Sequence, residues 1–499
     1  MKQNKQIETI IGSKYAIIGV PTLEDPQFKD RYQRVERESV GRMRSITNHF
    51  LGIPQYLSGI ASALSIFVVT QPWVAIVSLL SMAPTIFIER VFIKKEYEID
   101  TQTMKLHRSR GMYYYFLARG RAYLESRLLN IHKYLTEKVS YFWDQIISKR
   151  RQLYKDWRIW AYIAGIVDDV VSYSLDGLFA FQVIVGQITL GSAQAYIRAI
   201  ANFKQHVTSL TVDVLGLYEN HLYLKDLVWF LGLDNPYYNS IGEKVNTKKG
   251  LNIRFENVWF KYPGSENWIL KGVNFDINSG VNIAIVGNNG AGKTTMVKLI
   301  CGFYQPDKGR VTVNGIDVGN LNKSEYWDEL AVLFQDFDVY STSARESIAA
   351  GRISKVEDTE AIIRAAKLSD VDEWIKSLPL GYDTPLSRDF EKGVVPSTGQ
   401  WQRIGIARAL FRDPKVLILD EPTSNVDPEA EEEIFFNLLK VGEKKTIIFI
   451  SHRFSTVRRA DQIILLEDGA ISEKGTHEEL MKLKGKYSEL FNLQASSYK

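Results

Sequence analysis

The sequence predicts two domains of different fold class: an α-helical transmembrane domain of about four spans, then an α/β domain with a phosphate-binding P-loop. Three observations support this prediction. Residues 50–88 form a run of 39 residues without Asp, Glu, Lys or Arg. From Leu251 onward, short β-rich runs alternate with helical stretches, and one of these runs leads into a phosphate-binding loop. The 499 residues suffice for two or three domains, and we expect a division into residues 1–245 and 246–499.

Composition excludes several classes of protein. Hydrophobic residues make up 45% and charged residues 24% of the chain, which excludes collagen-like, low-complexity and wholly disordered proteins. A net charge of +4 is too small to indicate nucleic-acid binding, and we expect no nucleic-acid partner. The single cysteine, Cys301, excludes a disulfide framework and suggests a reducing compartment.

The uncharged run fits two membrane spans, since a spanning helix needs about 20 apolar residues. Gln71 and Pro72 lie near its middle, where Pro72 can open a second helix after a tight turn. The sequence therefore predicts a helical hairpin in the lipid bilayer, roughly residues 48–70 and 73–92. The alternative is a buried helical hairpin of a large soluble protein.

Charge distribution predicts the topology. Residues 94–158 carry 15 Lys and Arg against 7 Asp and Glu, as expected of long helices that project into the cytosol. A second apolar region, residues 159–200, is interrupted by Asp168, Asp169 and Asp176. Either it forms two more spans, or its helices are shifted so that these carboxylates lie in water. No signal peptide is visible. We expect a multi-pass cell-membrane protein whose N-terminus and C-terminal domain are both cytoplasmic.

A phosphate-binding motif follows the β-rich run 281–286. The motif is G-x-x-x-x-G-K-[ST], made by Gly287, Asn288, Asn289, Gly290, Ala291, Gly292, Lys293 and Thr294, with Thr295 next. Such a loop turns backbone N–H groups toward phosphate oxygens, and the helix after it adds positive potential. Lys293 is expected to reach the β- and γ-phosphates and Thr294 to ligate Mg²⁺, so ATP and Mg²⁺ are the expected cofactors.

Two acids end the apolar run 416–419. Asp420 can hold Mg²⁺ through water, and Glu421 can polarise a water for attack on the γ-phosphate. The alternative is that the two acids simply begin a loop.

From about Leu251 to Ser496, the chain resembles the nucleotide-binding domain of an ATP-binding cassette (ABC) transporter, because these landmarks occur in the family's order. The resemblance implies that Tyr262 stacks on adenine and that Gln335 senses Mg²⁺ and the attacking water. It further implies that His452 contacts the γ-phosphate and that Asp427 crosses a dimer interface.

The family signature LSGGQ is represented by Pro396, Ser397, Thr398, Gly399 and Gln400. The resemblance implies that Ser397, Gly399 and Gln400 serve the ATP bound by an opposite subunit. The Cβ of Thr398 crowds a position where close backbone approach is wanted, which predicts weaker closure on ATP. The expected partner is a second half-transporter, in a homodimer or a heterodimer.

The membrane half resembles ABC exporters. Residues 24–31 and 119–130 resemble segments that dock on the cassette, and residues 186–191 resemble the turn before the last transmembrane helix, at about residues 192–215. Asp168 and Asp169 would then line a path for a cationic or polar substrate. The first two of the family's usual six helices are not seen, so a truncated or mis-started reading frame, helices supplied by another polypeptide, and a four-span variant all stay open.

The predicted function is an ATP-driven exporter subunit for a peptide, lipid or drug-like substrate that the sequence does not specify. One alternative is a truncated subunit that hydrolyses ATP without transport. The other is a soluble ABC ATPase acting on nucleic acid or the ribosome.

Overall fold

A computed structural model describes residues 2–118, 122–234, 242–248, 250–422, 428–441, 445–451 and 453–496. The chain forms two compact units. Residues 1–17 and 22–234 make up the first, which we call the helical unit. Residues 18–21 and 235–499 make up the second, which we call the cassette.

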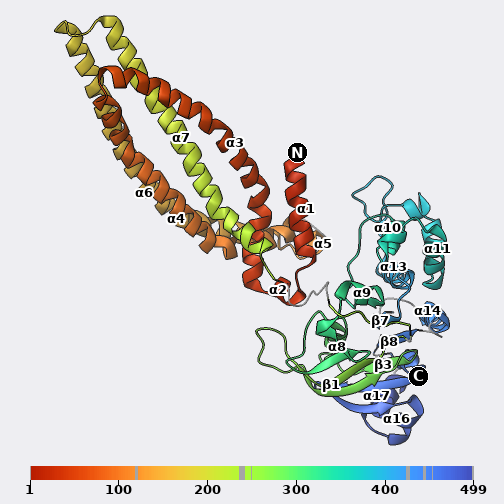
Figure 1. Ribbon diagram of the computed structural model, residues 1–499. Coiled ribbons are helices and arrows are strands. Elements are labelled where there is room, and N and C mark those ends of the chain that lie inside the picture. The colour runs from red at the N-terminus through yellow and green to blue at the C-terminus, as the bar shows by residue number, and fades with distance from the viewer. Residues whose placement is uncertain are drawn as a thin grey trace. The chain divides into compact units, whose positions relative to one another are not determined.

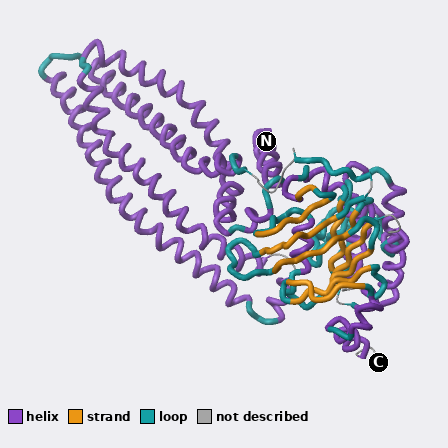
Figure 2. Tube along the Cα trace, turned by 60° about the horizontal axis from the view of Figure 1, so that its bottom comes forward, coloured by secondary structure: helices purple, strands orange, loops and turns teal. Residues whose placement is uncertain are grey.

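Every described regular element of the helical unit is a helix. They are α1 (Lys2–Ala16), α2 (Val20–Glu24), α3 (Pro26–Thr70), α4 (Trp73–Ala118), α5 (Ala122–Leu128), α6 (His132–Ile184) and α7 (Leu190–Leu231). Figures 1 and 2 show that the four long helices run alongside one another, and the main contacts join α3 to α7 and α4 to α6.

The predicted hairpin turn is confirmed. Helix α3 ends at Thr70 and α4 begins at Trp73, and the Gln71 N–H between them donates to the Phe67 carbonyl over 2.8 Å. Both helices are much longer than the predicted spans. At the end away from the turn, each apolar span continues as helix through charged residues, back to Pro26 in α3 and on to Ala118 in α4. Asp25 opens α3 as its N-cap by accepting from the Gln27 N–H.

Two described helices are long and apolar enough to cross a membrane by length and composition, within Pro26–Phe67 and Trp73–Ala118. Among the described residues, the expected second pair on α6 and α7 does not meet this test. The carboxylate of Asp168 accepts a hydrogen bond from Ser81 and pairs with Lys204 on α7 over 2.7 Å. A side chain expected to line a substrate path is thus tied to two neighbouring helices.

An apolar core joins the long helices where charged residues are scarce. Phe67, Val74, Met82, Phe179 and Phe203 are buried there, contributed by α3, α4, α6 and α7.

Toward the other end of the long helices, ion pairs of two buried aspartates join the same helices. Asp226 of α7 accepts from Arg31 and Arg34 of α3, and Asp100 of α4 accepts from Arg37 of α3 and Arg150 of α6. The four long helices are therefore held together by apolar packing near one end and by ion pairs near the other.

The cassette is built on two sheets. The larger has the strand order β10-β9-β3-β8-β7-β6, and its neighbours pair in parallel except at the edge strand β10. The smaller is antiparallel, with the order β2-β1-β4-β5. The strands are β1 (Ile253–Phe260), β2 (Leu270–Ile277), β3 (Asn282–Val286), β4 (Lys308–Val313), β5 (Ile316–Asp317), β6 (Leu330–Leu333), β7 (Val416–Asp420), β8 (Thr446–Ile450), β9 (Gln462–Glu467) and β10 (Ala470–Gly475).

The cassette alternates these strands with helices, as the predicted α/β class requires. The helices are α8 (Lys293–Ile300), α9 (Lys323–Asp328), α10 (Ala344–Ala349), α11 (Thr359–Leu368), α12 (Asp372–Lys376), α13 (Thr398–Phe411), α14 (Pro428–Val441), α15 (Phe454–Val457), α16 (His477–Leu483) and α17 (Lys486–Ser496). Of these, α10, α11 and α12 pack with α13 in an apolar cluster of their own. Residues of β3, β7, β8 and β9 are almost entirely buried, so the central strands read as continuous apolar runs. This rigid sheet positions the loops that follow its strands.

Candidate nucleotide-binding site

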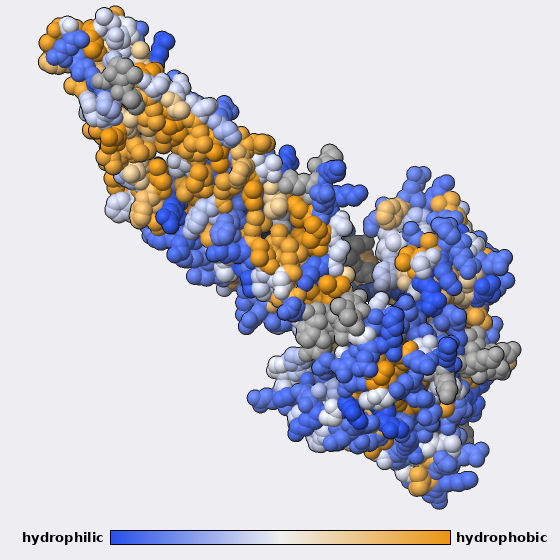
Figure 3. Space-filling model, viewed as in Figure 1, coloured by the Kyte–Doolittle hydropathy of each residue, from blue (hydrophilic) through white to orange (hydrophobic). Residues whose placement is uncertain are grey.

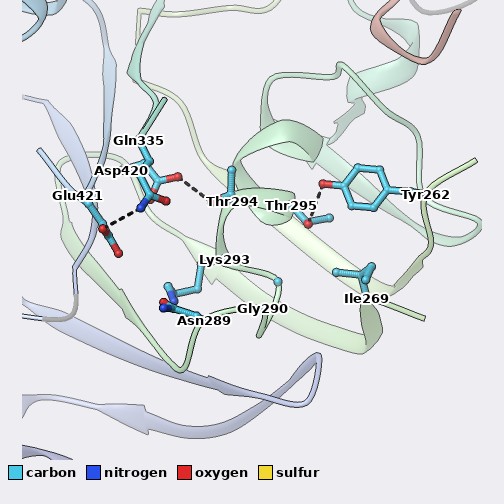
Figure 4. A pocket seen from close by; sticks show the side chains of 11 residues that line it. Tyr262, Ile269, Asn289, Gly290, Lys293, Thr294, Thr295, Gln335, Asp420 and Glu421 are labelled. Atoms are coloured by element: carbon cyan, nitrogen blue, oxygen red, sulfur yellow. Dashed lines mark hydrogen bonds between the residues drawn. The ribbon is translucent and has the colours of Figure 1, made fainter. Parts of the chain in front are cut away.

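A polar cavity of about 430 Å³ opens at one edge of the larger sheet (Figure 4). Strands β3, β7 and β6 run parallel, so their carboxyl ends reach the same edge. The phosphate-binding loop follows β3, Asp420 ends β7, and Gln335 comes two residues after β6. The sheet thus gathers residues that are more than 40 positions apart in the sequence.

Glycine gives the loop after β3 its shape. Gly290 and Gly292 have φ of 84° and 105°, in the region that side chains with a Cβ disfavour. A Cβ on Gly287 would collide with the Leu466 carbonyl. Gly292 is the N-cap of α8, so the first amides of this helix and the loop N–H groups form an anion-binding cradle.

Lys293 closes this loop. Its ammonium donates to the carbonyls of Gly287 and Asn288 over 2.7 and 3.0 Å, and the residue is only 8% exposed. Burial lowers the pKa of the Lys293 ammonium, while the charges of Glu421 and Asp420 oppose the change. A buried cation at the mouth of an amide cradle is suited to phosphate.

Asp420 lies beside the first turn of α8. The Thr294 hydroxyl donates to its carboxylate over 2.7 Å. Burial raises the pKa of the Asp420 carboxyl, and the hydrogen bond from Thr294 opposes that rise. These two oxygen-bearing side chains therefore face the cavity as a pair (Figure 4).

Glu421 is held by its neighbours in the sheet and in α13. Its φ is +50°, and its N–H donates to the Ile450 carbonyl over 2.8 Å. The Gln335 amide donates to the Glu421 carboxylate over 3.1 Å, and the Gln402 amide donates to the Glu421 carbonyl over 3.0 Å. The backbone and one carboxylate oxygen are fixed, as a group that orients a water requires.

Tyr262 lies at the other end of the cavity. Its hydroxyl is 3.1 Å from the Thr295 hydroxyl, and its ring meets Phe260 and Tyr304 edge to face. Ile269 lines the cavity close to this ring (Figure 4). An aromatic ring and an aliphatic side chain can together receive a flat base.

Other predicted residues lie outside the cavity lining. Ser397, Gly399 and Gln400 lie at the start of α13. Ser397 accepts from the Gln400 N–H, and the Gln400 side chain accepts from the Ser397 N–H over 2.7 Å, which makes a capping box. Ala291 is buried in the loop, whereas Asp427 and His452 lie outside the described residues.

Two contributors were missed by sequence reasoning. Ile269 carries no chemical signal, since an apolar residue before a strand is ordinary. Gln402 sits two positions after the signature segment, and only the fold reveals its contact with Glu421. Among the described residues, no group of three or more His, Cys, Asp or Glu side chains could hold a metal by itself.

The comparisons with known proteins agree with this geometry. A family profile described as "ABC transporter" matches residues 270–424. The subtilin transport ATP-binding protein SpaT of Bacillus subtilis is 30% identical over 488 residues, covering 96% of this chain and 78% of that protein. The nisin transport ATP-binding protein NisT of Lactococcus lactis subsp. lactis is 26% identical, covering 94% and 79%.

The fold likeness extends through both units. A bacterial Atm1-family ABC exporter with ATP bound matches with a TM-score of 0.85 at 20% identity, over 99% of this chain and 86% of that one.

The long helices and the phosphate-binding cassette define a membrane-transport ATPase. The chain belongs to the ABC transporter family: it is an ATP-driven exporter subunit in which a helical membrane domain is fused to an ATP-hydrolysing cassette.

Proposed function

We propose that this exporter subunit transports a peptide. The observation that carries the proposal is its similarity to proteins named for subtilin and nisin transport, which spans the helical unit as well as the cassette. In an exporter the membrane helices contact the substrate, so a likeness in substrate requires that these helices align as well as the cassette. The alignments with the two relatives cover 96% and 94% of the chain and therefore include the helices.

The cassette residues divide the ATP chemistry among them. Tyr262 and Ile269 receive the adenine, and the loop 287–292 with Lys293 and Thr295 binds the phosphates. Lys293 is already held at the loop carbonyls and only needs to turn toward the β- and γ-phosphates. Glu421 accepts the proton of the attacking water, and Gln335, which contacts its carboxylate, orients that water.

Thr294 and Asp420 fit the requirements of Mg²⁺. Their oxygens are hard donors, and the buried Asp420 carboxylate forms no ion pair with any described residue. When bound, the ion would neutralise charge on the phosphate oxygens. Gln335 is the third predicted ligand, and its side chain lines the same cavity.

A second half-transporter completes each ATP site. Ser397, Gly399 and Gln400 do not line the cavity of their own chain, although they expose the N-terminal end of the 14-residue helix α13. This end offers free backbone N–H groups and a positive dipole to a phosphate bound elsewhere. Asp427 and His452 would join the same sandwich.

In this proposal, residues 1–245 are the transmembrane domain and residues 246–499 the nucleotide-binding domain. The chain crosses the cell membrane four times, on α3, α4, α6 and α7, with its N-terminus and cassette in the cytosol. The apolar windows of α3 and α4 support the first two crossings. The excess of Lys and Arg between residues 94 and 158 supports the orientation.

Transport by proteoliposomes tests the peptide proposal. Fluorescently labelled nisin should enter vesicles whose cassettes face outward when ATP and Mg²⁺ are added, and it should not enter with the Glu421→Gln variant. A labelled phospholipid and a hydrophobic dye serve as competitors of the other two classes. ATP-dependent movement of either of them, without movement of the peptide, would contradict the proposal.

A further inference from the structure

A lysine of α8 lies against the aromatic ring that borders the nucleotide cavity. The Lys298 ammonium is 5.1 Å from the centroid of the Tyr262 ring and 5.6 Å from that of Tyr304. Both distances lie within the roughly 6 Å range of cation–π attraction. Lys298 is half-buried and forms no ion pair with any described residue, so its ammonium contacts these two rings instead of a carboxylate.

The same helix holds Tyr262 at two points. Thr295 contacts the phenol hydroxyl over 3.1 Å, and Lys298, three residues further along α8, contacts the ring. Residues three apart lie on one face of a helix. Phe260 and Tyr304 meet the ring edge to face at centroid distances of 5.1 and 5.4 Å, which leaves the ring little freedom to turn.

Helix α8 also begins at the phosphate-binding loop. Lys293 and Thr294 form its first turn, and Lys298 lies in its last turn. One rigid element therefore sets the distance between the phosphate cradle and the ring of Tyr262. Lys298 does not line the cavity, whereas the Tyr262 ring that it contacts does.

We propose that Lys298 is a positioning residue that holds Tyr262 in place to stack on the base of ATP. This inference rests on the proposed adenine-stacking role of Tyr262 and goes beyond it. Lys298 then contributes to binding of the base and not to binding of the phosphates. Its removal weakens ATP binding and leaves binding of a ligand without a base unchanged.

Calorimetric titration of the purified full chain with ATP and with inorganic tripolyphosphate tests this, in EDTA to prevent hydrolysis. Lys298→Met and Lys298→Gln should each raise the Kd of ATP about fivefold, which is the expected size of one cation–π contact. Neither should change the Kd of tripolyphosphate. Lys298→Arg keeps a cation near the ring and should restore ATP binding to within about twofold.

Two further variants complete the design. Lys474→Met removes an exposed lysine on β10 and should leave both affinities unchanged. Tyr262→Leu tests the stacking role itself and should weaken ATP binding more than Lys298→Met does. In the double variant, Lys298→Met should add no further loss, because the ring on which it acts is gone.

The possible failures are distinguishable. Equal weakening of ATP and tripolyphosphate by both Lys298 variants would mean that Lys298 serves the phosphates, which overturns the inference. So would an unchanged ATP affinity in both variants when Tyr262→Leu weakens ATP binding. If Tyr262→Leu leaves ATP affinity unchanged, the proposed stacking role fails, and the inference fails with it.

Discussion

The helical unit and the nucleotide site of the cassette bury carboxylates in opposite ways. Asp100, Asp226 and Asp420 are each 2% exposed. In the helical unit, Asp100 and Asp226 each accept from two arginines. In the cassette, Asp420 accepts from the Thr294 hydroxyl and forms no ion pair with any described residue. A buried carboxylate that pairs with two guanidinium groups joins helices. A buried carboxylate that forms no ion pair is suited to bind a metal cation.

The two units also differ in the hydropathy of their surfaces. Figure 3 shows apolar side chains gathered over the long helices, while the visible face of the cassette is mostly hydrophilic. The helical unit exposes Phe50, Leu51, Phe87 and Trp160, among other large apolar side chains. Many of its large apolar side chains thus face outward, as expected of a membrane domain, and part of its charge is buried between helices.

The largest expected effect breaks the chemistry of the cassette without affecting the helical unit. Glu421→Gln should lower the Mg²⁺-dependent ATPase rate about 10²–10⁴-fold, because the proton acceptor is lost. ATP binding and the melting temperature should stay near the wild-type values. Phosphate release is the measurement, and exposed Glu360→Gln is the control. A wild-type rate in Glu421→Gln would refute its assignment as the base.

The second expected effect is a loss of stability in the helical unit. Asp226→Asn leaves Arg34 buried without its carboxylate, and this should lower the free energy of unfolding by about 3 kcal/mol. Denaturant unfolding in detergent micelles is the measurement. Asp276→Asn removes a pair whose side chains are 60% and 51% exposed, and it should cost under about 1 kcal/mol. Equal losses from the two variants would mean that the burial of Asp226 adds nothing.

The cassette also buries a lysine side chain away from the nucleotide cavity. Lys323 is 1% exposed, donates to the Val318 carbonyl, and forms no ion pair with any described residue. Burial lowers the pKa of Lys323 from 10.5 to about 8. Between about pH 8 and pH 10.5, Lys323 is protonated in the unfolded chain and deprotonated in the folded chain. The free energy of unfolding therefore rises as the pH increases through this range.

The size of that pH effect is limited by the gap between the two pKa values, which corresponds to about 3 kcal/mol. Lys323→Met should abolish this component, so the wild type should gain stability relative to the variant between pH 8 and pH 10. Unfolding curves of both proteins at these pH values measure it. A constant difference between them would contradict the expected titration.

The smallest expected effect concerns the altered signature segment. Thr398 is exposed as the first residue of α13, next to its N-cap Ser397. Thr398→Gly removes a Cβ from a position where an opposite subunit is proposed to approach, so the ATPase rate should rise about two- to threefold. Steady-state ATPase assays against exposed Thr359→Gly test this. A lower rate would indicate that Thr398 contributes a favourable contact.

Much of the fold could be predicted from local patterns. The uncharged run predicts the hairpin turn at Gln71 and Pro72. The β-rich runs 251–260, 281–286, 311–313, 416–419, 446–450 and 462–467 predict the strands β1, β3, β4, β7, β8 and β9. Strand β2 is not predicted, because Leu270–Ile277 mixes Gly, Asn, Asp and Lys with its apolar residues. Strand β6 has four residues and β10 is a polar edge strand, so neither has a distinct apolar run.

Residues whose chemistry is local can be identified from the sequence alone. The loop 287–295, the acids that end β7 and the uncharged hairpin can be recognised because each signal lies within one short segment. Which distant groups meet depends on tertiary packing. Packing brings Gln402 to Glu421 and Lys204 to Asp168, and it places two arginines around each of the buried aspartates Asp100 and Asp226. Such pairs depend on how sheets and helices pack, and packing brings together side chains that no local pattern links.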